Sequence, residues 1–250
     1  MKVLVLGDAC KDIYVYGFSD RLAPEAPVPV FVEKEHKTNG GMALNVYNNL
    51  CSLGIECDIL HNEMEITKKR YVDDQTNHIF IRIDSDESNI DRVKQKYLSK
   101  DFLLKYDAIV ISDYDKGFLT REDIEKICYF HPLTFMDTKK RLGSWSEKCT
   151  WIKINEPEFE RTKFAIEDKM YIYDESLIVT LGSRGCMHKG KEYPVKKVEI
   201  KDLSGAGDTF LAGFVANYIR TKNLQESLEF ANKCATVIVQ QKGVNVIHGI

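Results

Sequence analysis

The chain has 250 residues, of which 44% are hydrophobic and 29% charged, so it can bury a full core in one domain. A formal net charge of −3 gives no general attraction to nucleic-acid phosphates, and we expect no nucleic-acid partner. The apolar run before Asp8 is too short for a secretory signal or a membrane span, so we expect a cytoplasmic protein with no membrane partner. The seven cysteines are scattered without metal-ligand spacing, which argues against structural zinc.

The predicted elements alternate along the chain. A continuous apolar run at about 2–6 predicts a strand covered on both faces, and Gly40 and Gly41 are predicted to open a helix whose apolar residues recur at three- and four-residue intervals. The segments 12–35 and 67–84 are β-prone, the first interrupted by prolines and the second by a polar turn, which predicts β structure outside the main sheet. The remaining predicted elements are a strand at 57–60, a helix at 90–105, a strand at 108–112, a helix at 121–129, strands at 134–136 and 151–154, a short helix after Pro157, a strand at 176–180, and helices at 206–221 and 224–241. This alternation predicts an α/β fold with a doubly wound, mainly parallel central sheet flanked by helices, in a single domain over residues 1–250.

Residues 202–210, DLSGAGDTF, carry the strongest chemical signal. Gly205, Ala206 and Gly207 precede an amphipathic run, and bare backbone N–H groups at a helix start suit a developing phosphoryl anion. Asp208 falls in the first turn of that helix, where a base that takes a proton from an attacking hydroxyl must lie. The alternative is structural: a tight turn at the glycines, with Asp208 as an acid that the helix dipole favours.

Two other phosphate motifs fail on their residues. The segment 185–192 has the glycine and lysine spacing of a P-loop, but Glu192 stands where Ser or Thr must ligate magnesium, and the segment is predicted to form a hairpin. The glycines at 205 and 207 lack the third glycine of a dinucleotide fingerprint, because Phe210 occupies that place. A P-loop enzyme and a Rossmann dehydrogenase are therefore both disfavoured.

These residues carry a family resemblance. Residues 202–210 are similar to the C-terminal signature of the ribokinase-like (phosphofructokinase B) carbohydrate kinases, and residues 40–45 are similar to their N-terminal glycine pair followed by asparagine. The chain most resembles the kinase domain of the bifunctional heptose-7-phosphate kinase/ADP-heptose synthase, which phosphorylates D-glycero-D-manno-heptose 7-phosphate at the anomeric oxygen. The segments that carry this closer resemblance are 7–12, 23–30, 66–70, 81–84, 112–117 and 155–160.

The resemblance implies an ATP-dependent sugar or sugar-phosphate kinase with Asp208 as the catalytic base and the amides of Gly205, Ala206 and Gly207 as the anion hole. The sugar hydroxyls would be held by Asp12, Gly40, Gly41 and Asn45, and Lys139 would meet a sugar phosphate. The nucleotide would be bound by Asn155, Thr180, Gly182, Gly185 and Asn232. Glu158 would organise magnesium indirectly, through its waters.

The implied cofactors are ATP and Mg²⁺, with a monovalent cation left open. The segments 12–35 and 67–84 would form a small β lid that closes over the sugar, and lids of this family often pair two chains into a homodimer. Such closure would exclude water from the phosphoryl group.

The chain departs from the family pattern in one place. Only about five residues connect the predicted strand at 57–60 to Ile66, where the subgroup carries a further strand–helix unit. The residues of the predicted chemistry lie outside this gap, so we expect phosphoryl transfer to be retained, while sugar choice and lid geometry stay open. The alternatives are a kinase for fructose 6-phosphate, another hexose phosphate or a nucleoside, and a non-catalytic sugar- or nucleotide-binding protein of kinase fold. Asp208, Asn155 and Glu158 together argue against the non-catalytic alternative, because binding alone needs neither a base nor a magnesium element.

Overall fold

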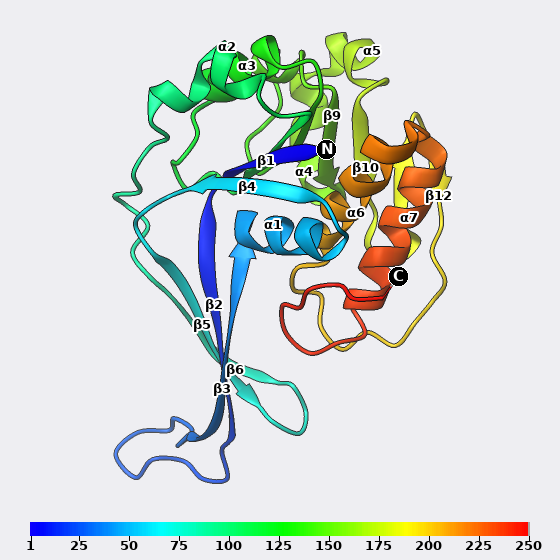
Figure 1. Cartoon of the computed structure of the whole chain (residues 1–250). Coiled ribbons are helices and arrows are strands. Elements are labelled where there is room, and N and C mark those ends of the chain that lie inside the picture. The colour runs from blue at the N-terminus through cyan, green and yellow to red at the C-terminus, as the bar shows by residue number, and fades with distance from the viewer. Residues whose placement is uncertain (250) are drawn as a thin grey trace.

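A computed structural model describes residues 1–249; Ile250, the last residue of the predicted domain, lies outside the described residues. The body is built on an eight-stranded sheet with the order β12-β11-β10-β9-β8-β7-β1-β4 (Figure 1). The strands are β1 (Lys2–Gly7), β4 (Glu56–His61), β7 (Ala108–Asp113), β8 (Thr134–Thr138), β9 (Trp151–Asn155), β10 (Leu177–Thr180), β11 (Cys186–His188) and β12 (Lys191–Tyr193). The strands from β4 to β10 pair in parallel, and β10, β11 and β12 pair antiparallel. The predicted α/β fold with a mainly parallel sheet is confirmed.

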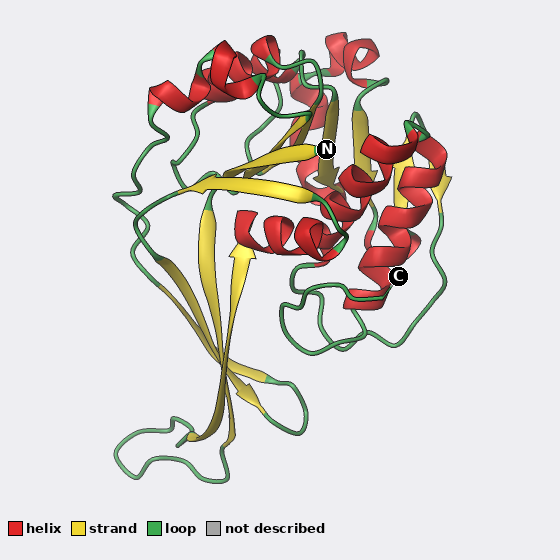
Figure 2. Cartoon of the chain, viewed as in Figure 1, coloured by secondary structure: helices red, strands yellow, loops and turns green. Residues whose placement is uncertain are grey.

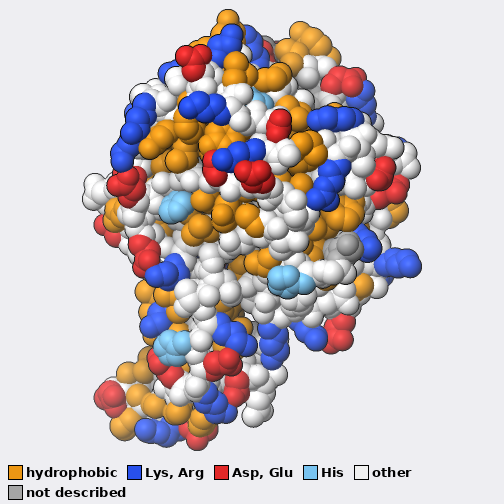
Figure 3. Space-filling view, in the orientation of Figure 1, with side chains coloured by type: hydrophobic (Ala, Val, Ile, Leu, Met, Phe, Trp, Pro, Cys, Tyr) orange, Lys and Arg blue, Asp and Glu red, His pale blue; other side chains and the backbone are white. Residues whose placement is uncertain are grey.

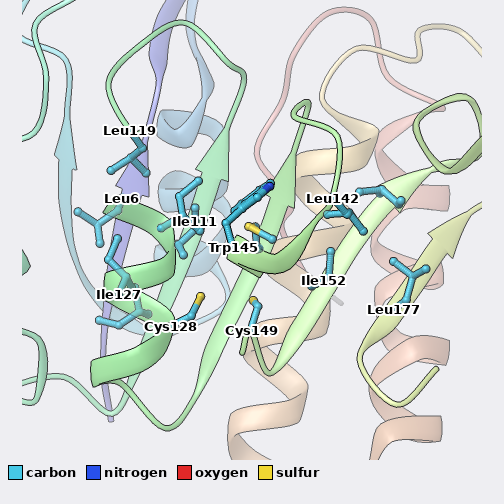
Figure 4. Close-up of a cluster of buried hydrophobic side chains, with 14 of the residues drawn as sticks. Leu6, Ile111, Leu119, Ile127, Cys128, Leu142, Trp145, Cys149, Ile152 and Leu177 are labelled. Carbon is cyan, nitrogen blue, oxygen red and sulfur yellow. The ribbon is translucent and has the colours of Figure 1, made fainter. Parts of the chain in front are cut away.

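Helices cover both faces of this sheet (Figure 2). One face packs against α1 (Ala43–Ser52), α6 (Ala206–Thr221) and α7 (Leu224–Ile238), and the other against α2 (Lys100–Leu103), α3 (Arg121–Phe130), α4 (Glu156–Thr162) and α5 (Met170–Tyr173). Successive strand residues point to opposite faces, so Val3 and Val5 pack with α1, α6 and α7, while Leu4 and Leu6 pack on the face covered by α2 to α5. Figure 4 shows Leu6 in the second of these clusters. Short 3₁₀ turns lie at η1 (Gln95–Leu98), η2 (Ser144–Ser146), η3 (Lys163–Ala165), η4 (Glu167–Lys169) and η5 (Gly182–Arg184). Within residues 1–249 no helix combines the length and the apolar character needed to cross a bilayer.

A second sheet, of four strands, projects from the body (Figure 1). Its strands are β2 (Ala9–Phe18), β3 (Val32–Met42), β5 (Ile66–Asp73) and β6 (Ile79–Asp84), in the order β3-β2-β5-β6. The two predicted β segments therefore form one sheet, because β2 pairs with β5 in parallel along its length. We call it the lid sheet.

Four predicted boundaries are wrong. The first β segment, predicted at 12–35, begins at Ala9 with β2 and continues to Met42 with β3, and residues 19–31 lie outside both strands. The segment 90–105 is not one helix but the turn η1 and the short helix α2, which Ser99 separates in an extended conformation (φ −74°, ψ 146°). Gly40 and Gly41 lie in β3, which ends at Met42, rather than opening a helix, and α1 begins at Ala43. The last helix ends at Ile238 instead of 241. The segment that mimics a P-loop does form the predicted hairpin, β11 and β12.

The short connection after β4 is closed by one side chain. Asn62 is buried, and its Oδ1 accepts a hydrogen bond from the Ala9 N–H at 2.7 Å while its Nδ2 donates to the Ala9 carbonyl at 3.1 Å. The amide thus satisfies both backbone groups of Ala9 at the start of the lid sheet. β4 is an edge strand of the main sheet, and the chain passes from it through residues 62–65 into β5.

Candidate active site

The segment predicted to carry the chemistry forms the N-terminus of α6. Gly205 precedes the helix in the left-handed region (φ 79°), and Ala206 is the first helical residue. Asp208 lies in the first turn, as predicted, and is only 4% exposed. The Ala206 N–H donates to the Leu203 carbonyl at 3.3 Å. The remaining N–H groups of this helix start and the partial positive charge of its dipole favour an anion beside Asp208.

Two donors hold the Asp208 carboxylate. The Tyr114 hydroxyl donates to Oδ1 at 2.7 Å, and the Asn45 amide donates to Oδ2 at 3.1 Å. Asn49, one turn further along α1, fixes Asn45 by donating to its Oδ1 at 2.9 Å. Burial raises the pKa of Asp208 to about 6, against the opposing effect of the hydrogen bonds from Tyr114 and Asn45. The group is therefore mostly ionised at pH 7 and can accept a proton near neutral pH.

The position of Tyr114 is set by Asp8. The buried Asp8 carboxylate follows β1 and accepts hydrogen bonds from the backbone N–H groups of Tyr114 at 2.7 Å and of Lys116 and Phe118 at 3.2 Å each. It thereby shapes the loop after β7 that carries Tyr114. β1 and β7 are parallel neighbours in the sheet, so the loops that follow these two strands both start at the carboxyl-terminal end of the sheet.

A small pocket of about 120 Å³ lies between the lid sheet and the start of α6. Its lining includes Asp12 from β2 and Lys68 and Arg70 from β5. Arg70 Nη1 donates to Asp12 Oδ1 at 2.5 Å, and the two side chains are 12% and 7% exposed. Gly41 permits this arrangement, because a Cβ there would lie 2.0 Å from Asp12 Oδ2. Of the predicted sugar-binding residues, Asp12 lines the pocket, whereas Gly40, Gly41 and Asn45 do not line it directly.

A cavity of about 800 Å³ adjoins the small pocket, and both are lined by Tyr114, Gly205 and Asp208. This volume is within the range of small-molecule and cofactor sites. All five predicted nucleotide-binding residues line it, namely Asn155, Thr180, Gly182, Gly185 and Asn232. Its apolar wall, which suits a flat base, is formed by Leu181, Val195, Val198, Ile200, Leu203, Ala235 and Val239.

A buried ion pair lines this large cavity. Lys153 Nζ lies 2.7 Å from Asp137 Oδ2, and the two side chains are 4% and 2% exposed. Burial alone would raise the pKa of Asp137, but the charges of Lys153 and then Lys139 lower it below its ordinary value. A Cβ at Gly207 would lie 2.9 Å from Lys153 Nζ, so this glycine lets the ammonium approach the start of α6. The lysine adds a full positive charge to the anion site of the helix.

Lys139 lies in the large cavity rather than the small pocket. Its Nζ is 2.6 Å from Glu158 Oε1 and 3.8 Å from Asp137 Oδ1. The structure therefore does not bring Lys139 together with Asp12 and Gly41, beside which the sequence predicted a sugar phosphate.

Asn155 and Glu158 cap α4. The Asn155 side chain accepts from the Glu158 N–H at 2.8 Å, and Glu158 Oε2 accepts from the Asn155 N–H at 2.9 Å. This reciprocal capping box fixes both side chains; Asn155 lines the large cavity, and Glu158 contacts Lys139, which also lines it. The other carboxylate oxygen of Glu158 faces Lys139.

Four residues of the site were not predicted as site residues: Lys68, Arg70, Tyr114 and Lys153. Three of them fall in segments that carry the family resemblance, and only the fold shows that their side chains converge near Asp208. Lys153 had a direct signal, because a lysine within the apolar run WIKI of a buried strand needs a partner.

Comparison with known proteins agrees with this geometry. The family model described as pfkB family carbohydrate kinase matches residues 69–247. The chain belongs to this family. It is therefore a carbohydrate kinase, a phosphotransferase, and the predicted family and enzyme class are confirmed.

The curated relatives that match are longer than this chain. The bifunctional protein HldE of a Nitratiruptor species is 30% identical over 291 residues, covering 97% of this chain and 62% of the relative. The bifunctional protein HldE of a Helicobacter pylori strain is 31% identical over 296 residues, covering 97% of this chain and 63% of the relative. The chain thus spans less than two thirds of the length of these relatives.

Solved structures share the fold at low identity. The ribokinase of Thermotoga maritima superposes with a TM-score of 0.72 at 16% identity, covering 97% of this chain and 94% of that one. The Arabidopsis thaliana ribokinase complexed with ribose and ATP gives a TM-score of 0.67 at 15% identity, covering 96% and 93%. Kinases of the ribokinase fold therefore use ATP in at least one solved case.

Proposed function

We propose that the chain transfers the γ-phosphoryl group of ATP to a hydroxyl of a sugar phosphate, with Asp208 as the base. One observation carries this proposal: the buried Asp208 lies at the start of α6, where the large cavity and the small pocket meet. A nucleotide in the large cavity and an acceptor in the small pocket would both reach this carboxylate. Such a position is what in-line transfer between two bound substrates requires.

Each group at the junction has a distinct role in the proposal. Asp208 takes the proton of the attacking hydroxyl, for which an ionised carboxylate with a pKa of about 6 is suited near neutral pH. The amides of Gly205, Ala206 and Gly207 and the ammonium of Lys153 stabilise negative charge on the transferred group. Asp12, Gly41 and Asn45 hold the acceptor hydroxyls.

The large cavity also fits the phosphates of ATP with magnesium. Asp137 Oδ1 is buried without a hydrogen-bond partner among the described residues, and Lys139 Nζ lies 3.8 Å from it, so this oxygen can still accept a hydrogen bond from an ordered water. Asp137, Asn155 and Glu158 offer oxygen atoms, which Mg²⁺ and its waters prefer, and we propose that they hold its hydration shell. Magnesium would neutralise charge on the β- and γ-phosphates.

The cations of the small pocket favour an acceptor that carries a phosphate. Arg70 is already paired with Asp12. Lys68 lies over the Tyr114 ring, 5.7 Å from its centroid, and forms no ion pair with a carboxylate in the described part of the chain. A phosphate monoester would supply the missing anion. We therefore propose Lys68 and Arg70, in place of Lys139, as the residues that meet the sugar phosphate.

D-glycero-D-manno-heptose 7-phosphate, phosphorylated at the anomeric oxygen, is the proposed acceptor, because the matching relatives are bifunctional HldE proteins. The test is ADP release with Mg-ATP against heptose 7-phosphate, fructose 6-phosphate, ribose, fructose and adenosine. We expect turnover with heptose 7-phosphate and little with the unphosphorylated sugars. The Lys68→Met variant should raise the KM of the phosphorylated acceptor and leave the KM of ATP unchanged. Measurable ATP binding without turnover on any acceptor would instead favour a non-catalytic binding protein.

We also propose that the chain forms a homodimer through the lid sheet. Ile79, Ile81 and Ile83 alternate along the edge strand β6 and are each about half exposed. In Figure 3 the projecting lid carries hydrophobic side chains among charged ones. Sedimentation of the wild type and of Ile81→Lys tests this: we expect a dimer that the lysine disrupts, and a wild-type monomer at micromolar concentration would contradict it.

A further inference from the structure

Tyr114 is the only side chain that both lines the two cavities and bonds the proposed base, within the residues that the structure describes. Its hydroxyl donates to Asp208 Oδ1 at 2.7 Å, and the Asn45 amide holds the other oxygen. Without Tyr114, Asp208 Oδ1 would be a buried carboxylate oxygen with no hydrogen-bond donor among the residues that the structure describes.

The ring of Tyr114 is held between two cations. Lys139 Nζ lies 5.0 Å from the ring centroid on the side of the large cavity, and Lys68 Nζ lies 5.7 Å from it in the small pocket. The backbone N–H is fixed by Asp8 at 2.7 Å. These contacts immobilise the side chain, so its hydroxyl is aimed at Asp208 before any substrate binds.

We propose that Tyr114 is a positioning residue of this kinase: its hydroxyl orients the Asp208 carboxylate, and its ring forms the wall between the acceptor pocket and the nucleotide cavity. The proposal rests on the proposed role of Asp208 as the base. It adds a residue that acts on the base rather than on a substrate.

The hydroxyl also keeps Asp208 ionised. Burial is the largest influence on this carboxylate and raises its pKa, and the Tyr114 hydrogen bond opposes burial. The other charged or titratable groups that line the cavity and the pocket with Asp208 are Cys10 and Asp12 on β2, Lys68 and Arg70 on β5, Asp137 on β8, Lys139 after it, Lys153 on β9, Glu156 on α4, and Lys196 and Lys197 before α6. The Tyr114→Phe substitution leaves all of them in place and removes one donor to a charged acceptor, so the pKa of Asp208 should rise by about one unit.

The test compares the pH dependence of kcat in the wild type and in Tyr114→Phe. The midpoint of the kcat profile should move from about 6 to about 7. The kcat of the variant should therefore be about twofold lower than that of the wild type at pH 7, about fivefold lower at pH 6, and little changed by ionisation at pH 8. The control is Tyr106→Phe, because the Tyr106 hydroxyl donates to Asp58 Oδ2 at the same 2.7 Å far from the site. This control should keep the wild-type profile.

A titration of the Asp208 carboxyl by ¹³C NMR decides the proposal independently of turnover, with Asp208→Asn used to assign the signal. A higher midpoint in Tyr114→Phe than in the wild type is the expected result. An unchanged midpoint in a folded variant would overturn the role of Tyr114 even if turnover fell. Absence of acceptor-dependent turnover in the wild type would instead refute the proposed phosphoryl transfer with Asp208 as the base, and the NMR midpoint would still report on Tyr114.

Discussion

Replacement of Lys153 by methionine tests how much the buried Lys153–Asp137 ion pair contributes to the stability of the fold. Lys153 and Asp137 are 2.7 Å apart, with side chains only 4% and 2% exposed. Methionine keeps an unbranched side chain but removes the charge, which leaves Asp137 with Lys139 at 3.8 Å as its remaining cation. Breaking a buried pair in this way costs about 3–5 kcal/mol. In a domain of this size we therefore expect the Tm at pH 7 to fall by about 6–20 °C.

The pH dependence of this loss has a definite sign. In the wild type the pKa of Asp137 is lowered, so its contribution to stability is present above the ordinary value of 3.8 and is lost as the pH falls through the folded value. In Lys153→Met the buried Asp137 carboxylate should protonate more readily. The Tm difference between the two proteins should therefore be largest near pH 7 and narrow towards pH 4.

Two further variants separate charge burial from other effects. Lys153→Met combined with Asp137→Leu removes both charges and should recover most of the lost stability without recovering activity. Lys94→Met breaks an exposed pair with Glu63, whose side chains are 61% and 73% exposed, and should leave the Tm close to that of the wild type. Thermal melts monitored by circular dichroism supply the measurement. A Tm for Lys153→Met within about 2 °C of the wild type would refute the reasoning.

Three other predictions concern the same site. Gly41→Ala places a methyl group against the Asp12 carboxylate. In steady-state assays it should raise the KM of the acceptor about tenfold or more without changing the KM of ATP. An unchanged acceptor KM would contradict the proposed acceptor pocket. Asp208→Asn should stabilise the fold by about 3 kcal/mol at pH 7, because the pKa of Asp208 is about 6 in the folded protein and 3.8 ordinarily. This gain in the free energy of unfolding should shrink as the pH falls through 6 towards 4. Urea unfolding at pH 7 and pH 4 tests it, and a destabilised variant would contradict it. Glu158→Gln should raise the Mg²⁺ concentration for half-maximal activity severalfold, and an unaltered Mg²⁺ dependence would remove Glu158 from the magnesium shell.

Much of the fold could be predicted because its signals are local. The apolar runs of the parallel strands and the β-prone segments around 12–35 and 67–84 identified both sheets. The helix predicted at 90–105 failed for a tertiary reason. The Val93 N–H bonds to the Phe118 carbonyl, and Ser99 is extended, so the chain follows the body instead of continuing one helix.

The candidate site was predictable where a contiguous motif carried it. Asp208 lies in the first turn of its helix because the glycines and the helix start are adjacent in sequence. Tyr114 is separated from Asp208 by 94 positions, and nothing local indicates that its hydroxyl faces this carboxylate. Lys139 is a second example. The sequence predicts a cation after a strand, but its pairing with Glu158 depends on the neighbouring elements β9 and α4. Residue chemistry is thus visible in sequence, while the pairing of distant residues is fixed by the sheet order.

The central claim is that Asp208 is the base for transfer between the two pockets. Asparagine at this position keeps the shape and can bond both Asn45 and Tyr114, so substrate binding should survive. The most direct measurement is single-turnover phosphoryl transfer in the wild type and in Asp208→Asn, with ATP and acceptor affinities measured by calorimetry on the same samples. We predict affinities within about threefold of the wild type and a transfer rate lower by about two orders of magnitude or more. A transfer rate within tenfold of the wild type, with both substrates bound, would contradict the account.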